Sequence, residues 1–302
     1  MALPRQTIVP LIVACALLMQ NVDSTVIATA IPKIAEDLGV PALRLNLAIT
    51  SYLLSLAIFI PLSGWTADRY GARTVFRAAI LVFTLGSIAC GISQSLTQLV
   101  LARIFQGMGG AMMVPVGRLV LLRAVPKAEL VRAMSFLTVP ALIGPILGPP
   151  LGGFIVTYWS WRWVFFINVP IGILGMALVS RYIENVREDR TPPLDKAGFL
   201  LAGSGLAAVM FGFETVGRGM LAPEIAASLL VAGAILLALY WLHARAAASP
   251  IIDLGLMRIA TFRYSIVGSG VFRIGIEGLP FLMPMLLQVG FGLSPFQSGL
   301  LS

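Results

Sequence analysis

Long apolar runs separated by short polar stretches make up almost the whole chain. A helix needs about 20 mostly apolar residues to cross a bilayer, and nine windows of this kind occur along the sequence. They cover residues 8–30, 44–63, 75–94, 98–123, 133–157, 161–183, 197–216, 224–243 and 264–288. After a Gly, Ser and Pro turn at 290–295, residues 296–302 have the pattern of the first turns of a tenth span. The pattern predicts an all-α polytopic membrane protein whose last helix is incomplete.

Composition agrees with the hydropathy pattern. Hydrophobic residues make up 58% of the chain, charged residues only 11%, and the mean hydropathy is +0.94. These values lie far outside those of soluble globular proteins. The net charge of +8 does not indicate nucleic-acid binding, because the sequence has no soluble basic domain.

The positions of the basic residues predict the orientation. With the N-terminus in the cytoplasm, 14 of the 21 Lys and Arg residues fall on the inner side, four fall outside and three lie within spans. Basic residues in short loops stay on the cytoplasmic side, so we expect a multi-pass protein of the cell's inner membrane with a cytoplasmic N-terminus. Residues 5–30 also have features of a cleavable signal peptide.

Polar stretches divide the chain into groups of spans. Residues 184–196 mix both charge signs around two prolines and are predicted to be a cytoplasmic linker. We therefore expect a six-helix bundle over residues 1–183, an inserted helix pair over 197–243, a cytoplasmic loop over 244–263, and the start of a second bundle over 264–302.

Residues typical of enzymes and metal sites are scarce. His243 is the only histidine, at the end of a span, and both cysteines, Cys15 and Cys90, lie in spans. Neither an H-E-x-x-H nor a C-x-x-C motif occurs. We expect no cofactor and no metal site, and an intramembrane enzyme is the least supported class of function.

The connection between the second and third spans reads "GWTADRYGAR". Gly64 and Gly71 permit a tight turn, and Asp68 can accept a hydrogen bond from a helix N-terminus or from an arginine. Arg69 and Arg73 would also serve simply as anchors on the inner side.

The fourth span places Arg103, Gln106, Gly107 and Gly110 on one helical face. An arginine at that depth costs about 2.5–3.5 kcal/mol to insert, so it should face a cavity or a partner. The alternative is a side chain that snorkels to the outer surface.

The first span carries Asp23 on a polar face with Gln20. Loss of hydration favours the neutral form of a buried carboxyl group, which could exchange a proton as access alternates. The alternative is a permanently protonated carboxyl group that only holds two helices together.

Glycines and prolines interrupt the apolar fifth span. Gly144, Gly148 and Gly152 recur every four residues, so they line one side of a helix and permit close approach of a second helix. Pro149 and its neighbours remove backbone donors and bend the helix. Gly153 extends the same breaker-rich stretch, and such a bend can act as a gate.

The ninth span contains Arg273 and Glu277, one turn apart. They either neutralise each other or take part in substrate binding or coupling, since an unpaired charge in lipid is costly.

The motifs of the first span, of the connection at 64–73, of the fourth span and of the fifth span resemble, in their order along the chain, those of the major facilitator superfamily. The stretches at 160–172 and 194–205 and the extra helix pair are similar to its fourteen-helix drug:proton antiporter family of the EmrB/QacA type. The resemblance implies two six-helix bundles with an inserted pair, of which this chain holds the first bundle, the pair and the opening of the second.

The resemblance also implies roles for residues. Gly64, Asp68, Arg69, Gly71 and Arg73 would latch the halves of the transporter, and the motif from Gly144 to Gly153 would mark an exporter. Asp23 with Arg103 would couple transport to protons. The candidates for the substrate cavity are Gln20, Gln106, Arg273 and Glu277.

The predicted function is proton-coupled export of small lipophilic or drug-like molecules. Because three arginines lie in spans, an exporter of organic anions or metal chelates is the alternative. The expected partners are the substrate, protons and the bilayer, and the sequence does not indicate an oligomeric state.

Overall fold

The computed structural model describes residues 5–216, 222–277, 286, 290 and 291. Its regular elements are helical, and these described residues contain no strand. The chain forms two compact units, Met1–Ile251 and Ile252–Ser302. The helices of the first unit are α1 (Arg5–Leu38), α2 (Ala42–Phe59), α3 (Leu62–Tyr70), α4 (Ala72–Gly91), α5 (Leu96–Ala124), η1 (Lys127–Glu129), α6 (Leu130–Tyr158), α7 (Trp163–Phe166), α8 (Asn168–Tyr182), α9 (Lys196–Val216) and α10 (Pro223–Ala246).

The helices of the first unit account for the first eight predicted spans. Six described segments are each long and apolar enough to cross a membrane, namely Ile8–Leu38, Ala72–Gly91, Leu96–Ala124, Trp163–Tyr182, Lys196–Val216 and Pro223–Ala246. The bent pair Arg44–Phe59 and Leu62–Tyr70 makes a seventh. The fifth predicted span corresponds to α6, a helix of 29 residues that includes the apolar stretch Ile146–Tyr158.

Two predicted spans are broken at prolines. The chain turns by 58° between α2 and α3, because Pro61 lacks an N–H group and its ring clashes with the preceding helical turn. The sixth span is interrupted at Ile167, between α7 and α8, three residues before Pro170. The proline cannot donate to the carbonyl four residues earlier, which weakens the helix at this point.

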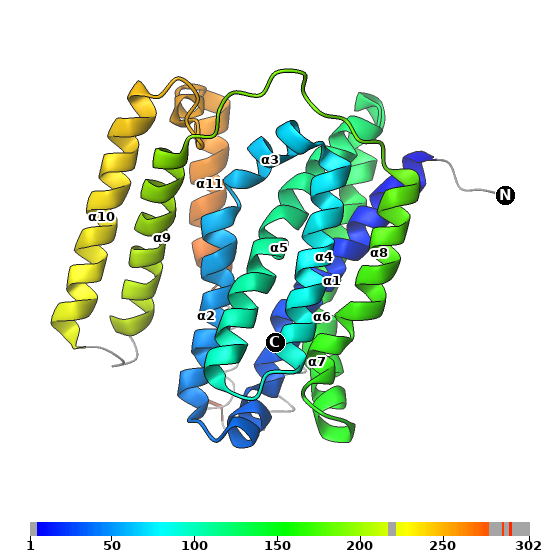
Figure 1. Cartoon of the computed structure of the whole chain (residues 1–302), viewed down its shortest axis with the longest axis vertical. Coiled ribbons are helices and arrows are strands. Elements are labelled where there is room, and N and C mark those ends of the chain that lie inside the picture. Colours follow the sequence, from blue (N-terminus) through cyan, green and yellow to red (C-terminus); the bar gives the residue numbers. More distant parts are fainter. Residues whose placement is uncertain (1–4, 217–221, 278–285, 287–289, 292–302) are drawn as a thin grey trace. The chain divides into compact units, whose positions relative to one another are not determined.

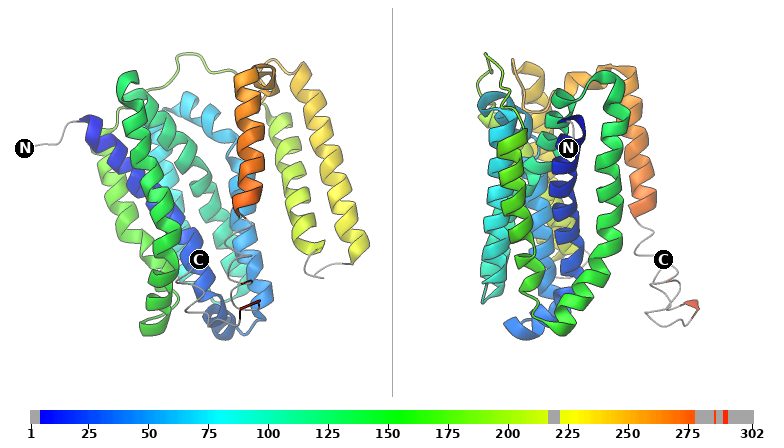
Figure 2. Two further views of the ribbon diagram at one scale, coloured as in Figure 1. Left: turned by 180° about the vertical axis from the view of Figure 1, so that it is seen from behind. Right: turned by 90° about the vertical axis from the view of Figure 1, so that its right-hand side faces the viewer.

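The bundle has two layers in Figure 1, with α2, α5, α4 and α8 side by side and α1 and α6 behind them. The view from behind in Figure 2 shows α6 and α1 nearest the viewer. α4 packs along α5, and α1 packs along α6. α3 lies across α5 and leads into α4.

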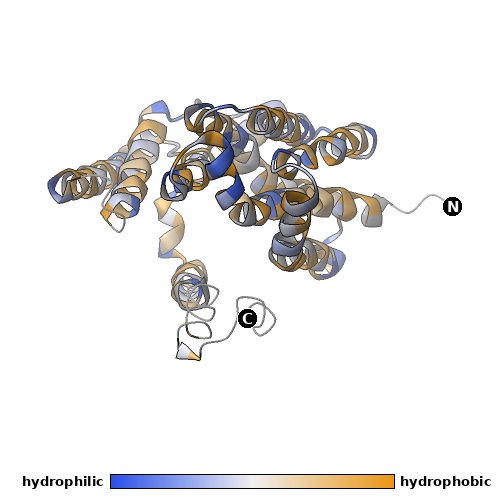
Figure 3. Cartoon of the chain, turned by 90° about the horizontal axis from the view of Figure 1, so that it is seen from below, coloured by the Kyte–Doolittle hydropathy of each residue, from blue (hydrophilic) through white to orange (hydrophobic). Residues whose placement is uncertain are grey.

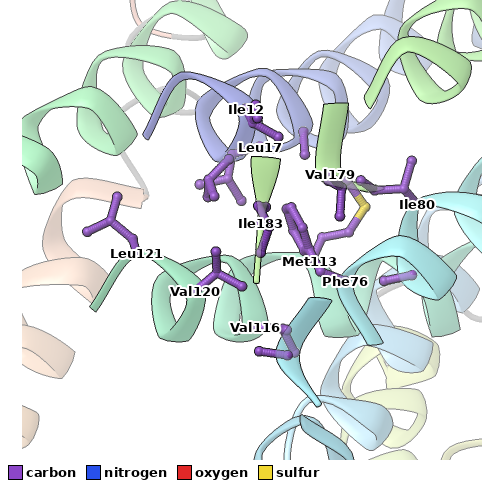
Figure 4. Close-up of a cluster of buried hydrophobic side chains, with 14 of the residues drawn as sticks. Ile12, Leu17, Phe76, Ile80, Met113, Val116, Val120, Leu121, Val179 and Ile183 are labelled. Atoms are coloured by element: carbon purple, nitrogen blue, oxygen red, sulfur yellow. The ribbon is translucent and has the colours of Figure 1, made fainter. Parts of the chain in front are cut away.

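The bundle is apolar inside and outside. Figure 4 shows side chains of α1, α4, α5 and α8 pointing toward one another, among them Leu17, Phe76, Met113 and Val179. In Figure 3, apolar residues also colour much of the outer side of the helices. Large apolar side chains such as Leu101, Ile146 and Leu200 are exposed. Such a surface is expected of helices that face lipid.

α9 and α10 form a hairpin beside α2. Asp195 closes its end, because the carboxylate accepts hydrogen bonds from the Gly198 N–H at 2.8 Å, from His243 Nε2 at 2.8 Å and from the Ile251 N–H at 3.3 Å. Burial opposes ionisation, but these hydrogen bonds outweigh it and hold the pKa of Asp195 below its ordinary value.

The second unit contains η2 (Leu254–Arg258) and α11 (Ala260–Glu277). Asp253 caps η2 by accepting a hydrogen bond from the Gly255 N–H. Arg273 and Glu277 both lie on α11. The rest of the ninth predicted span, and the tenth helix predicted at 296–302, fall outside the described residues, apart from position 286.

Candidate functional site

A buried ion pair joins α1 to α5. Arg103 Nη1 donates to Asp23 Oδ2 over 2.7 Å, and both side chains are fully buried. Two charges leave water at a high desolvation cost, which is offset only when geometry and further hydrogen bonds are good. The structure therefore brings together the acid and the arginine that the sequence placed 80 residues apart.

Gln106 and Asn168 form hydrogen bonds with the ion pair, and Ser87 accepts a hydrogen bond from each of them. Gln106 accepts from Arg103 Nη1 at 2.7 Å and donates to Asp23 Oδ1 at 2.9 Å and to Ser87 Oγ at 2.7 Å. Asn168, at the start of α8, donates to the same Asp23 oxygen at 2.7 Å and to Ser87 Oγ at 3.2 Å. The carboxylate of Asp23 thus accepts hydrogen bonds from α5 and α8, and Ser87 links α4 to the cluster. We call Asp23, Ser87, Arg103, Gln106 and Asn168 the polar cluster.

Aromatic rings enclose the guanidinium. The centre of the Arg103 guanidinium lies 4.4 Å from the Tyr52 ring centroid and 5.6 Å from that of Phe165. Arg103 Nε and Nη2 have no hydrogen-bond acceptor among the described residues. The attraction between the cation and these aromatic rings therefore helps to stabilise the guanidinium in the apolar interior.

The two glutamines predicted to line a cavity lie in different surroundings. Gln106 is fully buried inside the polar cluster. Gln20 lies on α1 one turn before Asp23, and its Nε2 atom is close to Gly110. Neither residue lines the described cavities of about 160, 350 and 560 Å³.

Three glycines of α6 pack against α1. A Cβ atom on Gly144 would clash with Asn21, one on Gly148 with Thr25, and one on Gly152 with Thr29. Thr25 Oγ1 also donates to the Gly144 carbonyl over 3.4 Å. The predicted close approach of a second helix is therefore present, and the partner is the helix that carries Asp23.

Pro149 and Gly153, the other two residues of this motif, do not share the surroundings of Gly144, Gly148 and Gly152. Gly153 has no atom within 4 Å of the position of its Cβ, and Pro149 is exposed. Both therefore lie off the contact with α1.

The turn predicted in the connection at 64–73 is wrong in part. Residues Leu62–Tyr70 form α3, and Gly64 lies inside this helix with a free surrounding space. Ser63 and Ala67, one turn apart, are buried, and this packing holds the segment as a helix. Only Gly71 makes the turn, with a φ of +90° that L-residues rarely adopt.

Asp68, in the connection between α2 and α4, forms an ion pair with an arginine of α5. Arg123 Nη2 lies 3.1 Å from Asp68 Oδ1 and 3.1 Å from Glu188 Oε1. Arg69 and Arg73, by contrast, project at the surface, exposed and half-buried respectively. Asp68 therefore pairs with an arginine outside its own motif.

Residues 185–188, which follow α8, form hydrogen bonds with the residues around the turn at Gly71. The Ala72 N–H donates to the Val186 carbonyl, and the Glu188 N–H donates to the Asp68 carbonyl. Asn185 Oδ1 accepts from the Thr74 N–H at 3.2 Å. The predicted linker is thus tied to the bundle along its first residues.

The sequence analysis missed Asn168, Ser87, Tyr52 and Glu188. Asn168 is a single amide in the apolar run "VFFINVPIG", and a buried amide needs hydrogen-bond partners. That signal could have identified it. Serine and tyrosine are ordinary within apolar helices, and Glu188 is one of several linker charges, so these three carried no distinguishing signal.

Comparison with known proteins places these features in a family. The model of the Major Facilitator Superfamily matches residues 13–302. A protein of Salmonella heidelberg (strain SL476) named multidrug resistance protein MdtD is 44% identical over 290 residues, which cover 96% of this chain and 62% of that protein. The protein of the same name from Salmonella typhimurium (strain LT2) is 44% identical over 294 residues, with the same coverage. The chain therefore spans 62% of the length of these relatives.

Two solved structures share the fold. The POT family transporter PepTSo matches with a TM-score of 0.56 at 13% identity, over 80% of this chain and 52% of that chain. A bacterial homologue of the human lysosomal transporter Spinster, inward-facing and occupied, matches with a TM-score of 0.56 at 17% identity, over 78% and 59%. At these identities the likeness concerns the fold alone.

Proposed function

This chain belongs to the Major Facilitator Superfamily, and from that premise we propose that it carries the proton-coupling half of an antiporter that exports small lipophilic or drug-like molecules by alternating access. In this proposal residues 1–183 are the N-terminal bundle, 184–196 the linker, 197–243 the inserted pair, 244–263 a loop and 264–302 the opening of the second bundle. The activity is transport, not enzymatic catalysis.

The observation that carries the proposal is the buried ion pair between Asp23 and Arg103. A proton that binds Asp23 removes its negative charge and with it the attraction to Arg103. Gln106 and Asn168 would still hold the carboxyl group, while the guanidinium would keep its charge in an apolar site. Since an unpaired buried charge costs about 3–5 kcal/mol, protonation would favour a rearranged bundle.

The contact between α1 and α6 offers a route for that rearrangement. Asp23 lies on α1, and the opposite face of α1 packs on Gly144, Gly148 and Gly152. Because the two helices are in close contact, a shift of α1 would therefore also move α6. One proton that crosses a potential of 100 mV supplies about 2.3 kcal/mol to drive such a shift.

The substrate class is inferred from the relatives, whose names refer to multidrug resistance. An exporter of organic anions or metal chelates is the competing proposal. It is weakened because the Arg103 charge is already balanced by Asp23. Binding assays that compare a lipophilic cation with a carboxylate would separate the two, and preferential binding of the carboxylate would favour the competing proposal.

We further propose that the protein lies in the inner membrane with its N-terminus in the cytoplasm. The end of the bundle that holds Gly71, Arg123 and the linker would then face the cytoplasm, as the excess of basic residues favours. In this proposal Gly64, Asp68, Arg69, Gly71 and Arg73 belong to the latch between the transporter halves.

The deciding experiment uses Asp23→Asn in the full-length protein. The amide keeps the size of the side chain but cannot bind and release the proton. In inverted vesicles with an imposed pH gradient, we expect the variant to fold and bind substrate but to lose gradient-driven uptake. Glu36→Gln, on the exposed end of the same helix, is the matched control and should keep wild-type rates.

Wild-type uptake by Asp23→Asn would show that the carboxyl group is structural. Coupling would then have to be sought at Glu277, which can be substituted in the same assay.

A further inference from the structure

Tyr52 of α2 has its ring and its hydroxyl group beside different parts of α5. The centre of the Arg103 guanidinium lies 4.4 Å from the ring centroid. The hydroxyl oxygen lies 3.0 Å from the position that a Cβ atom would take on Gly110, and Gln20 Nε2 of α1 lies 3.6 Å from the same position. The tyrosine therefore extends from the guanidinium to a place beside Gly110 where it comes together with the Gln20 amide.

Buried donors and acceptors along this tyrosine lack partners. Among the described residues, neither the Tyr52 hydroxyl nor Gln20 Oε1 forms a hydrogen bond, and Arg103 Nε and Nη2 have no acceptor. An unpaired buried polar atom is costly, so each one in a folded protein needs an explanation. A hydroxyl oxygen and an amide oxygen can both accept from a guanidinium N–H. These unpaired groups therefore indicate a second arrangement in which they bind each other.

The hydrogen bonds of Asp23 decide which of its oxygens takes up a proton. Oδ1 accepts from Gln106 at 2.9 Å and from Asn168 at 2.7 Å, whereas Oδ2 accepts from Arg103 Nη1 at 2.7 Å. In a neutral carboxyl group only one oxygen carries a proton, and two amide donors require that Oδ1 stay an acceptor. The new O–H bond therefore forms at Oδ2. The hydrogen bond from Arg103 is lost there, and the guanidinium keeps its own proton and charge.

We propose that Tyr52 and Gln20 form a second position for the Arg103 guanidinium. When Asp23 takes up a proton, the guanidinium leaves Oδ2, moves along the tyrosine ring and donates to the Tyr52 hydroxyl and to Gln20 Oε1. Tyr52 and Gln20 are positioning residues, because they act on the proton-binding group through Arg103.

The second position rests on the proposed coupling role of Asp23 and adds a direction to it. Gly110 lies seven residues after Arg103 on α5, nearer the end of the helix that holds Arg123. Gln20 precedes Asp23 on α1. Proton uptake would therefore move a positive charge toward the linker end of the bundle. Asn168 Oδ1 also lacks a donor, but that amide is bonded to the Asp23 oxygen that Arg103 does not contact.

The test is a double-mutant cycle, read as thermal unfolding of the full-length protein in detergent. Asp23→Asn imitates the protonated state, because the amide oxygen stays with its two amide donors and the NH2 group faces Arg103, donor against donor. The guanidinium should then occupy the second position permanently. Tyr52→Phe keeps the aromatic ring and removes only the hydroxyl group.

The expected effect of Tyr52→Phe reverses between the two backgrounds. In the wild type the hydroxyl group is unpaired, so its removal should leave the melting temperature unchanged or raise it. In the Asp23→Asn background the hydroxyl group accepts from a charged donor, so its removal should lower the melting temperature by a few degrees. A double variant that fails to fold, while both single variants fold, shows the same loss in a stronger form.

Two further variants serve as replicate and control. Gln20→Met keeps the length of the side chain but removes its acceptor, and it should show the same reversal. Tyr158→Phe removes the hydroxyl group of an exposed tyrosine at the end of α6, so its effect should be equal in both backgrounds.

Infrared difference spectra between acid and neutral pH give a readout that packing alone would not change. In the wild type, we expect the carboxyl band of Asp23 to appear together with a shifted tyrosine band. Both should be missing in Asp23→Asn, and only the tyrosine band should be missing in Tyr52→Phe.

Two results would overturn the second position: equal effects of Tyr52→Phe in the two backgrounds, or a wild-type carboxyl band without any tyrosine band. The uptake assay of Asp23→Asn tests coupling separately. Normal gradient-driven uptake would refute coupling, whereas the reversed effect of Tyr52→Phe would still establish where the guanidinium moves when the charge of Asp23 is removed.

Discussion

At the scale of single residues, Asn168 is the member of the polar cluster whose substitution is most informative. Asn168→Leu removes a hydrogen bond to a charged acceptor, worth about 1.5–3 kcal/mol, and leaves Asp23 with fewer donors. We expect a lower melting temperature in detergent, measured on the full-length protein.

A double-mutant cycle provides the control for Asn168. In the Asp23→Asn background, the charged acceptor is gone, so Asn168→Leu should cost less than in the wild type. Equal costs in the two backgrounds would show that Asn168 acts through packing alone.

Gly64 and Gly71, both shortly before the start of α4, differ in backbone conformation. They therefore allow a matched pair of alanine substitutions. Gly71→Ala should destabilise the protein by about 1–3 kcal/mol, because φ is +90° and a Cβ atom would clash with Asn185. Gly64→Ala should be neutral or stabilise by about 0.5–1 kcal/mol, because Gly64 is helical and has open space around it. Thermal unfolding of both variants checks the ranking, and the reverse order would refute this account of the turn.

At the scale of helices, the contact of α1 with α6 is the element that we expect to limit cycling. Gly148→Val would place a branched side chain against Thr25 and push the two helices apart. We expect a well-expressed protein with little transport. Gly153→Val, five residues later on α6 and with open space around it, should transport normally. A similar loss of transport in both variants would mean that the lower helix propensity of valine, and not the contact with α1, causes the effect.

At the scale of the whole molecule, orientation is the testable property. In a Cys15→Ser background, Arg187→Cys in the linker should resist an impermeant thiol reagent added outside intact cells. Gln94→Cys, beyond the far end of α4, should react, since the 20 residues of that helix separate it from the linker side. Labelling of Arg187→Cys from outside would invert the proposed topology.

Much of the fold followed from the order of residues alone. Helices that face lipid need long apolar runs, so the approximate limits of the helices up to Ala246 were readable from hydropathy. The breaks at Pro61 and Ile167 were not predicted, because an apolar window is the same whether its helix is straight or broken. The helix α3 was mistaken for a loop, because its short buried face of Ser63 and Ala67 is too weak a pattern to detect.

The sequence by itself determined the class of the protein, the charge asymmetry, the glycine stripe and the candidates Asp23 and Arg103, because each depends on local composition or helical spacing. Only the tertiary structure decided which groups meet: Arg103 with Asp23, Asn168 with the same carboxylate, and Arg123 with both Asp68 and Glu188. These partners lie 55 to 145 positions apart. Contacts of that kind arise from how the helices pack against one another, and hydropathy does not encode which faces of two helices come together.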